Sequence, residues 1–298
     1  MKSHNQYFKQ GIKWNGFSQL FNQVSMFISG IILMRVLTPE DFGLVALVTI
    51  VFGFSKILIN SGLSSSLINK KNISKNDFNY VFTFTLFFAI LISIIQFALS
   101  HPLSVFFNDE RLQLLFKISA LILFITPLSS IPHAILARKL DFKNLAIIDF
   151  ISIIISLSSA IWMAYNDYGY FSLIFLHLIK QTVKVILMFV VSKYMPVLAF
   201  NYSSFIGHLK FGYPILLSKF LNYSMSNIDK LLISKFFGGS SLGLYSRGLS
   251  FVSKPTTTIT QVLNKSLFPI LSDMKNHNKI EQIKSNILKI YQVLFFFT

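Results

Sequence analysis

Residues 35–47 read RVLTPEDFGLVAL, a short polar stretch between two apolar runs. Thr38 is the predicted N-cap of a helix with Pro39 in its first position, where proline costs no hydrogen bond. Glu40 and Asp41 then fall in the first turn of that helix, where negative charge is favoured. The stretch therefore predicts a tight turn between two helices.

The apolar runs on either side of this turn belong to a chain that is apolar throughout. Hydrophobic residues make up 53% of the 298 residues, charged residues only 13%, and the mean hydropathy is +0.61. Ordinary soluble domains carry about 25% charged residues. Apolar runs of membrane-spanning length recur along the chain, and each can satisfy its own backbone hydrogen bonds as a helix. The sequence predicts an all-α, polytopic membrane helix bundle with roughly nine spans, near residues 14–37, 43–68, 78–100, 112–137, 144–165, 169–192, 211–236 and 242–269, with the last beginning near residue 285.

The polar amino terminus, MKSHNQYFKQGIKWNG, carries no signal-peptide pattern, so we expect the first span to be retained. The chain has no cysteine, which excludes disulfides and cysteine-based metal or catalytic sites. The net charge of +16 would indicate nucleic acid on a soluble protein. In a membrane protein this charge is better explained by lysines and arginines that set the topology and by an anionic lipid substrate. No nucleic-acid partner is expected.

The cations are concentrated in alternate connections. The amino terminus and the second, fourth, sixth and eighth connections hold most of the lysines, whereas the odd-numbered connections hold few cations and several acidic residues, among them Glu40, Asp109 and Asp167. The positive-inside rule therefore predicts a multi-pass protein with a cytoplasmic amino terminus.

An internal repeat appears when the sequence is shifted by 200 residues. Ser18, Asn22, Ile28, Gly43 and Leu44 then fall on identical residues at 218, 222, 228, 243 and 244. The repeat predicts two parallel lobes of like orientation, a known transporter plan. Residues 1–200 would form an N-terminal lobe of six helices plus the inter-lobe loop, and residues 201–298 an incomplete C-terminal lobe of two full helices and the start of a third.

Polar residues follow one face of the first two spans of each predicted lobe. Charges at membrane depth need a wet cavity or a partner. We expect these spans to face one another around a hydrophilic, basic cavity suited to a phosphate or pyrophosphate, with these candidate binding residues: Asn22, Lys56, Lys219, Asn222, Asp229, Lys230 and Lys254.

Several of these residues have simpler interpretations. Asp229 is expected to meet a basic group on a neighbouring helix, either as a structural ion pair or as part of the site. Lys230 could extend toward the membrane interface. Lys180 and Lys184, one turn apart on the sixth span, could do the same, bind phospholipid headgroups, or line the inner mouth of the cavity.

No catalytic centre is predicted. The histidines form no set, since His133 and His177 stand alone and no HExxH or HxxxH pairing occurs. There is no Walker motif and no long external loop for acid–base chemistry. No metal and no cofactor are therefore expected, and the chain is not expected to be an enzyme.

Several motifs, in order along the chain, carry a resemblance: RVLTPEDFGLVAL, GLSSSLINKKNISKNDFNYVF, IPHAILARKLDFKNLA, NIDKLLISKFFGGSSLGLYSR and SLFPILSDM. Together they resemble the Wzx/WzxC-type polysaccharide flippases of the multidrug/oligosaccharidyl-lipid/polysaccharide exporter superfamily. The resemblance implies more helices than this sequence holds, so the chain is expected to be truncated at its carboxyl end.

The same resemblance implies an activity. Such flippases move undecaprenyl-diphosphate-linked oligosaccharide repeat units across the bacterial inner membrane by alternating access, for lipopolysaccharide O-antigen, capsule or exopolysaccharide. The implied partners are the polyprenyl-diphosphate-linked oligosaccharide, membrane lipid and the polysaccharide polymerase machinery. Three alternatives remain: an ion-coupled small-molecule exporter of the same superfamily, a membrane glycan polymerase or ligase, and a scaffold without transport.

The opening stretch is also one copy of the repeat. Its acidic pair is replaced by Ser240 and Ser241 in the second copy, KFFGGSSLGLYSR, so turn geometry is what repeats. The repeat indicates two matching hairpins that act as an outer gate, with these residues: Arg35, Pro39, Gly43, Lys235, Gly243 and Arg247.

Overall fold

The computed structural model describes residues 4–59, 75–139, 141–200 and 202–250. The described chain forms one compact unit that ends at Ser246, and residues 247–250 begin a second unit. The division into lobes at residue 200 stays a prediction. All the regular elements in these ranges are helices: α1 (His4–Val36), α2 (Pro39–Ile59), α4 (Lys75–Ala98), α5 (Ser100–Phe106), α6 (Arg111–Ile125), the 3₁₀ helix η1 (Thr126–Ser129), α7 (Ser130–Arg138), α8 (Phe142–Tyr165), α9 (Tyr170–Ser192), α10 (Tyr202–Met225), and a further helix over residues 228–250.

Six helical segments of the described chain are long and apolar enough to cross a membrane. They confirm the first six predicted spans, with bounds Gly16–Val36, Pro39–Ile59, Asn76–Ala98, Arg111–Arg138, Phe142–Tyr165 and Tyr170–Ser192. The seventh predicted span corresponds to α10 and the start of the helix over residues 228–250, and its membrane crossing stays a prediction. The ninth span and most of the eighth lie outside the described residues.

The turn at residues 37–38 forms as the sequence predicts. The Thr38 hydroxyl accepts a hydrogen bond from the Asp41 backbone N–H (3.2 Å), and Asp41 Oδ2 accepts from the Thr38 backbone N–H (2.9 Å) and hydroxyl (2.8 Å). This reciprocal arrangement is a capping box, with aspartate in place of the usual glutamate or glutamine. It fixes the start of α2 at Pro39.

The fourth span is interrupted, which the hydropathy pattern did not indicate. Pro127 lies in the 3₁₀ turn η1 between α6 and α7. Proline has no backbone N–H and cannot continue the α-helical ladder. The Thr126 hydroxyl donates to the carbonyl oxygen of Ile122 (2.7 Å), and Gln181 on α9 donates to the carbonyl oxygen of Thr126 (3.4 Å). Polar side chains thus form hydrogen bonds with backbone carbonyl groups at the break.

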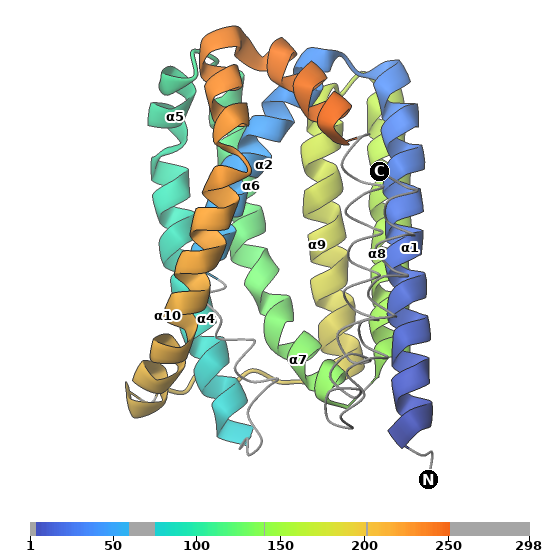
Figure 1. The fold of residues 1–298 in the computed structure, drawn as a ribbon, viewed down its shortest axis with the longest axis vertical. Coiled ribbons are helices and arrows are strands. Elements are labelled where there is room, and N and C mark those ends of the chain that lie inside the picture. Colours follow the sequence, from blue (N-terminus) through green and yellow to red (C-terminus); the bar gives the residue numbers. More distant parts are fainter. Residues whose placement is uncertain (1–3, 60–74, 140, 201, 251–298) are drawn as a thin grey trace, which may run out of the picture. The chain divides into compact units, whose positions relative to one another are not determined.

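Helix α6 occupies the middle of the packing arrangement. It contacts α2, α4, α5 and α9, while α8 packs between α1 and α9 (Figure 1). The main core cluster joins Leu47 of α2, Phe116 of α6 and Ile174 of α9, all less than 5% exposed. Large apolar side chains such as Phe87 and Val190 are exposed, as expected for surfaces that face lipid.

A buried polar network ties three helices together. Gln96 of α4 is 2% exposed, accepts a hydrogen bond from the Ser55 hydroxyl of α2 (2.7 Å) and donates to Ser119 Oγ of α6 (2.6 Å). Ser119 in turn donates to the carbonyl oxygen of Phe116 (2.9 Å). Because lipid offers no competing partners, such bonds orient helices within a bundle.

Candidate functional site: a basic cluster and a glycine contact

Titratable side chains from four helices gather in one region of the described chain. We call this region the basic cluster, and it comprises Lys56 of α2, His133 of α7, Asp149 of α8, and His177, Lys180 and Lys184 of α9. The spacing of 3 and 4 residues along α9 places its three members on one face. The basic cluster therefore holds three lysines and one carboxylate inside the membrane-spanning region.

The one ion pair in the basic cluster is between Lys184 and Asp149, whose Nζ and Oδ1 atoms lie 2.6 Å apart. The two side chains are 25% and 28% exposed. Lys56 and Lys180 lie within electrostatic range of each other and of Lys184. Lys56 is exposed, and its Nζ lies 5.9 Å from the Phe52 ring centroid. Since a single carboxylate cannot neutralise three ammonium groups, the basic cluster keeps a net positive charge able to hold an anion.

Sequence reasoning missed part of the basic cluster. The fifth span contributes Asp149, which was not among the predicted binding residues. His133 and His177, which belong to no set of histidines, both lie within electrostatic range of the lysines. The sequence did offer a signal for Asp149, since it is an acidic residue within an apolar span, and a charge at membrane depth requires a partner. Within the described residues, no group of three or more His, Cys, Asp or Glu side chains could hold a metal ion.

The other candidate binding residues lie elsewhere. Asn22 is half-buried on α1. Lys219 and Asn222 are exposed on α10, where the Asn222 amide lies 3.4 Å from Ser218 Oγ as a hydrogen-bond donor. Lys254 lies outside the described residues.

Two candidates are used locally at the break after α10. Lys230 Nζ donates to Asn227 Oδ1 (2.9 Å) and to the carbonyl oxygen of Ser226 (3.3 Å), so it closes the turn at residues 226–227. Asp229 Oδ2 accepts from the Tyr245 hydroxyl (2.6 Å). The partner expected for Asp229 was a cation, and the one that the structure shows is a hydroxyl.

The predicted second hairpin is not a turn between two helices. Residues 235–247 lie within the helix over residues 228–250, with a positive φ at Gly238, and the chain breaks at residues 226–227 instead.

This copy of the repeated segment and the turn before α2 nevertheless meet through their glycines. A Cβ atom added to Gly43 would lie 1.7 Å from the carbonyl oxygen of Gly239. One added to Gly243 would lie 1.9 Å from the carbonyl oxygen of Pro39. Real Cβ contacts of this length do not occur, so both positions require glycine for the backbones to approach. Residues 200 positions apart in the sequence are therefore in contact.

Further contacts surround this glycine contact. Lys235 donates to the carbonyl oxygen of Phe106, and its Nζ lies 4.4 Å from the ring centroid of the same residue. Arg111 bridges Glu40 and Asp109, with Arg111 Nε 3.0 Å from Asp109 Oδ1. Arg35 is exposed at the end of α1. Arg247 lies in the second unit, and its role in a gate stays a prediction.

Helix α10 packs against α2 at residues farther along α2 than the glycine contact. The Tyr223 hydroxyl donates to the carbonyl oxygen of Ile50 (3.2 Å), and its ring meets Phe54 edge to face at 4.9 Å. A Cβ atom added to Gly53 would lie 2.0 Å from the Tyr223 hydroxyl. The first helix of the second repeat copy thus packs on the second helix of the first copy.

Comparison with known proteins agrees with the motif resemblance. The model of a family described as "Polysaccharide biosynthesis protein" matches residues 32–298. A membrane protein in the cps region of Klebsiella pneumoniae is 27% identical over 95% of this chain and 58% of its own length. The succinoglycan biosynthesis transport protein ExoT of Rhizobium meliloti is 24% identical over 89% of this chain and 54% of its own length. The lipopolysaccharide biosynthesis protein WzxC of Escherichia coli is 20% identical over 95% of this chain and 58% of its own length.

The chain thus spans a little over half the length of these curated relatives. No solved structure matches it.

Proposed function

Because the chain belongs to the family of polysaccharide biosynthesis proteins, we propose that it translocates undecaprenyl-diphosphate-linked oligosaccharide across the bacterial inner membrane, for surface polysaccharide biosynthesis. The names of its relatives, which refer to succinoglycan transport and to lipopolysaccharide biosynthesis, support the general class. The observation that carries the proposal is the basic cluster, because a diphosphate is an anion that partly exposed lysines can bind within a membrane.

The depth of the basic cluster supports a role in uptake from the cytoplasm. With the amino terminus in the cytoplasm, α2 and α9 run inward, while α8 runs outward from its start at Phe142. Lys56, Asp149 and Lys184 then all lie in the inner half of their helices. The lipid-linked substrate would be met there, in the leaflet where its diphosphate faces the cytoplasm.

The glycine contact supports a state closed toward the outside. Gly43 lies one turn into α2, at the opposite end of that helix from Lys56. A closed outer end together with partly exposed lysines at the inner end is the arrangement expected before translocation. Movement of the two repeated segments apart would then release the substrate outward.

Binding by the purified chain in detergent tests this proposal. A polyprenyl diphosphate carrying one sugar is the probe, and the neutral polyprenol of the same length is the reference. The double variant Lys56→Gln/Lys180→Gln is expected to bind the diphosphate probe about tenfold more weakly than the unmodified chain, since each lysine would contact phosphate oxygens. Equal binding by the two proteins would count against the proposal.

Lys117→Gln is the matched control. Lys117 also lies in a membrane-spanning helix, but its Nζ is 5.5 Å from the Phe97 ring centroid and it is not part of the basic cluster. Its replacement is expected to leave the affinity for the diphosphate probe unchanged. An equal loss in the control would mean that total charge, rather than the basic cluster, determines binding.

Export of cations is the second candidate function, favoured by the carboxylate of Asp149. That carboxylate is already paired with Lys184, and two further lysines lie nearby. Cationic cargo would therefore meet net repulsion. Tight binding of a cationic dye in the same assay, released by Asp149→Asn, would favour this alternative.

A further inference from the structure

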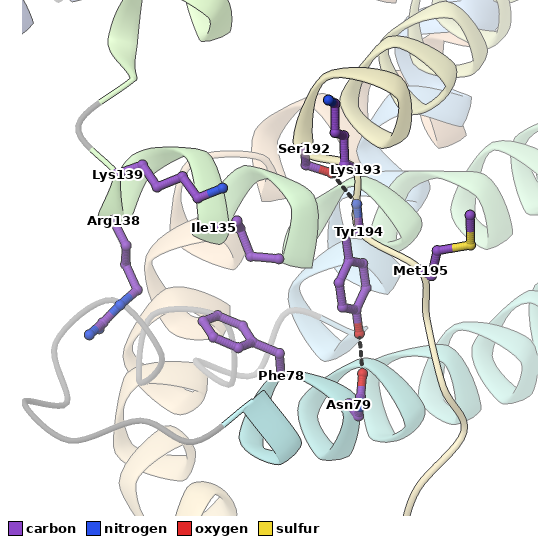
Figure 2. A pocket seen from close by; sticks show the side chains of 9 residues that line it. All are labelled: Phe78, Asn79, Ile135, Arg138, Lys139, Ser192, Lys193, Tyr194 and Met195. Carbon is purple, nitrogen blue, oxygen red and sulfur yellow. Dashed lines mark hydrogen bonds between the residues drawn. The ribbon is translucent and has the colours of Figure 1, made fainter.

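A pocket of about 570 Å³ lies away from the basic cluster, at the ends of α7 and α9 and beside the start of α4. Figure 2 shows the nine residues that line it. None of them belongs to the basic cluster or to the glycine contact. With the amino terminus in the cytoplasm, this pocket opens at the cytoplasmic face of the membrane.

Three cations line the pocket and no acidic residue does. Arg138 and Lys139 come from the end of α7, and both are exposed. Lys193 comes from the end of α9, where it adopts the left-handed conformation with φ +54°. In Figure 2, Lys139 extends toward the side of the pocket formed by Lys193 and Tyr194. Cations at helix carboxyl ends are also favoured by the helix dipole.

The floor of the pocket is apolar and firmly held. Phe78 and Ile135 contribute apolar surface, and Met195 lies at the edge of the pocket with 85% of its surface exposed. The Tyr194 hydroxyl donates to Asn79 Oδ1 (2.8 Å), and its ring stacks on Phe189 with centroids 6.4 Å apart. Burial raises the pKa of Tyr194 to about 12, so its hydroxyl stays neutral and adds no negative charge. The pocket therefore offers cations above an aromatic and aliphatic floor.

We propose that this pocket binds a phosphate group at the cytoplasmic face, either on an anionic phospholipid or as free phosphate. Lysine suits a phosphate as a point charge, and arginine can add a bidentate contact. The apolar floor would receive the glycerol and first methylene groups of a lipid. Basic pockets on the cytoplasmic side of membrane helices are suited to such headgroups.

A bound phosphate would also brace the chain segment that leads out of α9. Lys193, Tyr194 and Met195 begin this segment, which returns along α4. The Ala199 backbone N–H donates to Thr83 Oγ1 (3.0 Å), and the Phe200 ring packs against Phe84 at 5.2 Å. A ligand held by both Lys139 and Lys193 would link α7 to the start of this segment.

The test uses the purified chain and three probes: short-chain phosphatidylglycerol, phosphatidylcholine of the same chain length, and inorganic phosphate. The variant is Lys139→Gln/Lys193→Asn, in which asparagine is chosen because it tolerates a positive φ. Lys143→Gln is the matched control, since Lys143 is exposed in the first turn of α8 and does not line the pocket. Binding is measured by titration, and circular dichroism verifies that each protein is folded.

The unmodified chain and the Lys143→Gln control are expected to bind phosphatidylglycerol equally. The double variant is expected to bind it about tenfold more weakly, through the loss of two charge-assisted contacts. If inorganic phosphate competes with phosphatidylglycerol, the phosphate group alone suffices; if it does not, the lipid is the ligand. Equal affinity in all three proteins, or equal competition by phosphatidylcholine, would overturn the proposal.

A second variant tests the pocket without removing a cation. Met195→Glu would place a carboxylate at the exposed edge of the pocket, two residues after Lys193, where its negative charge would oppose the binding of a phosphate. We expect a similar loss of phosphatidylglycerol binding. Unchanged binding by a folded Met195→Glu protein would also overturn the proposal.

Discussion

At the scale of single residues, glycine determines how the two copies of the repeated segment, residues 35–47 and 235–247, meet. Gly43 and Gly243 are related by the sequence repeat, and each lies against a carbonyl oxygen of the other segment. The sequence predicted that the two segments matter together, because the glycines recur while the acidic pair does not. It could not predict that they touch, since a repeat gives equivalence of position and no distance.

Replacing Gly43 with alanine is predicted to destabilise the chain. The new Cβ would overlap the Gly239 carbonyl, and backbone movement of this kind costs about 1–3 kcal/mol. The control is Gly16→Ala in α1, because nothing lies within 4 Å of a Cβ at that position. Thermal unfolding in detergent should show a lower Tm for Gly43→Ala and an equal or higher Tm for Gly16→Ala. A Tm unchanged by Gly43→Ala would argue against the close contact.

At the scale of helices, hydropathy predicted six spans close to their observed bounds. It did not predict the break at η1, since the run from residue 112 to 137 is apolar throughout and a proline within it can be tolerated. It also did not predict α5, because a helix of 7 residues is too short for a periodic pattern. Asp149 was overlooked because its partner, Lys184, is 35 residues away in the sequence.

The hydrogen-bond network of Gln96 joins three helices, and its contribution to stability can be measured. Gln96→Leu would remove the hydrogen bonds that join α2, α4 and α6. Interhelical bonds of this kind contribute about 0.6 kcal/mol each on average, so the free energy of unfolding is expected to fall by about 1 kcal/mol. Chemical denaturation can measure this difference.

Ser93→Ala is the comparison for Gln96→Leu. Ser93 Oγ is buried and has no hydrogen-bond partner in the described part of the chain, so its removal should be neutral or stabilising. If both substitutions leave the free energy of unfolding unchanged, the network does not hold the helices together.

At the scale of the molecule, the features of the compact unit divide between its two ends. The glycine contact and the Glu40–Arg111–Asp109 group lie at one end, and the basic cluster and the phosphate-binding pocket lie toward the other. Figure 1 shows these two ends, with the start of α2 at the top and the end of α7 at the bottom. The distribution of lysines predicts which end faces the cytoplasm.

Cysteine labelling can test this orientation, because the chain has no cysteine of its own. A cysteine at Asp167, in the turn between α8 and α9, is expected to react with a membrane-impermeant maleimide in cells whose outer membrane has been permeabilised. A cysteine at Lys143 is expected to react only after the inner membrane is opened. The reverse pattern would show that the amino terminus lies outside.

The central claim is that the basic cluster holds the diphosphate of the lipid-linked substrate. The most direct measurement is a double-mutant cycle between Lys56→Gln and the loss of one phosphate from the probe, using a polyprenyl diphosphate sugar and its monophosphate counterpart. If Lys56 contacts the diphosphate, the two changes are coupled, and the interaction energy is expected to be about 1 kcal/mol or more. Strictly additive effects on the binding free energy would contradict the claim.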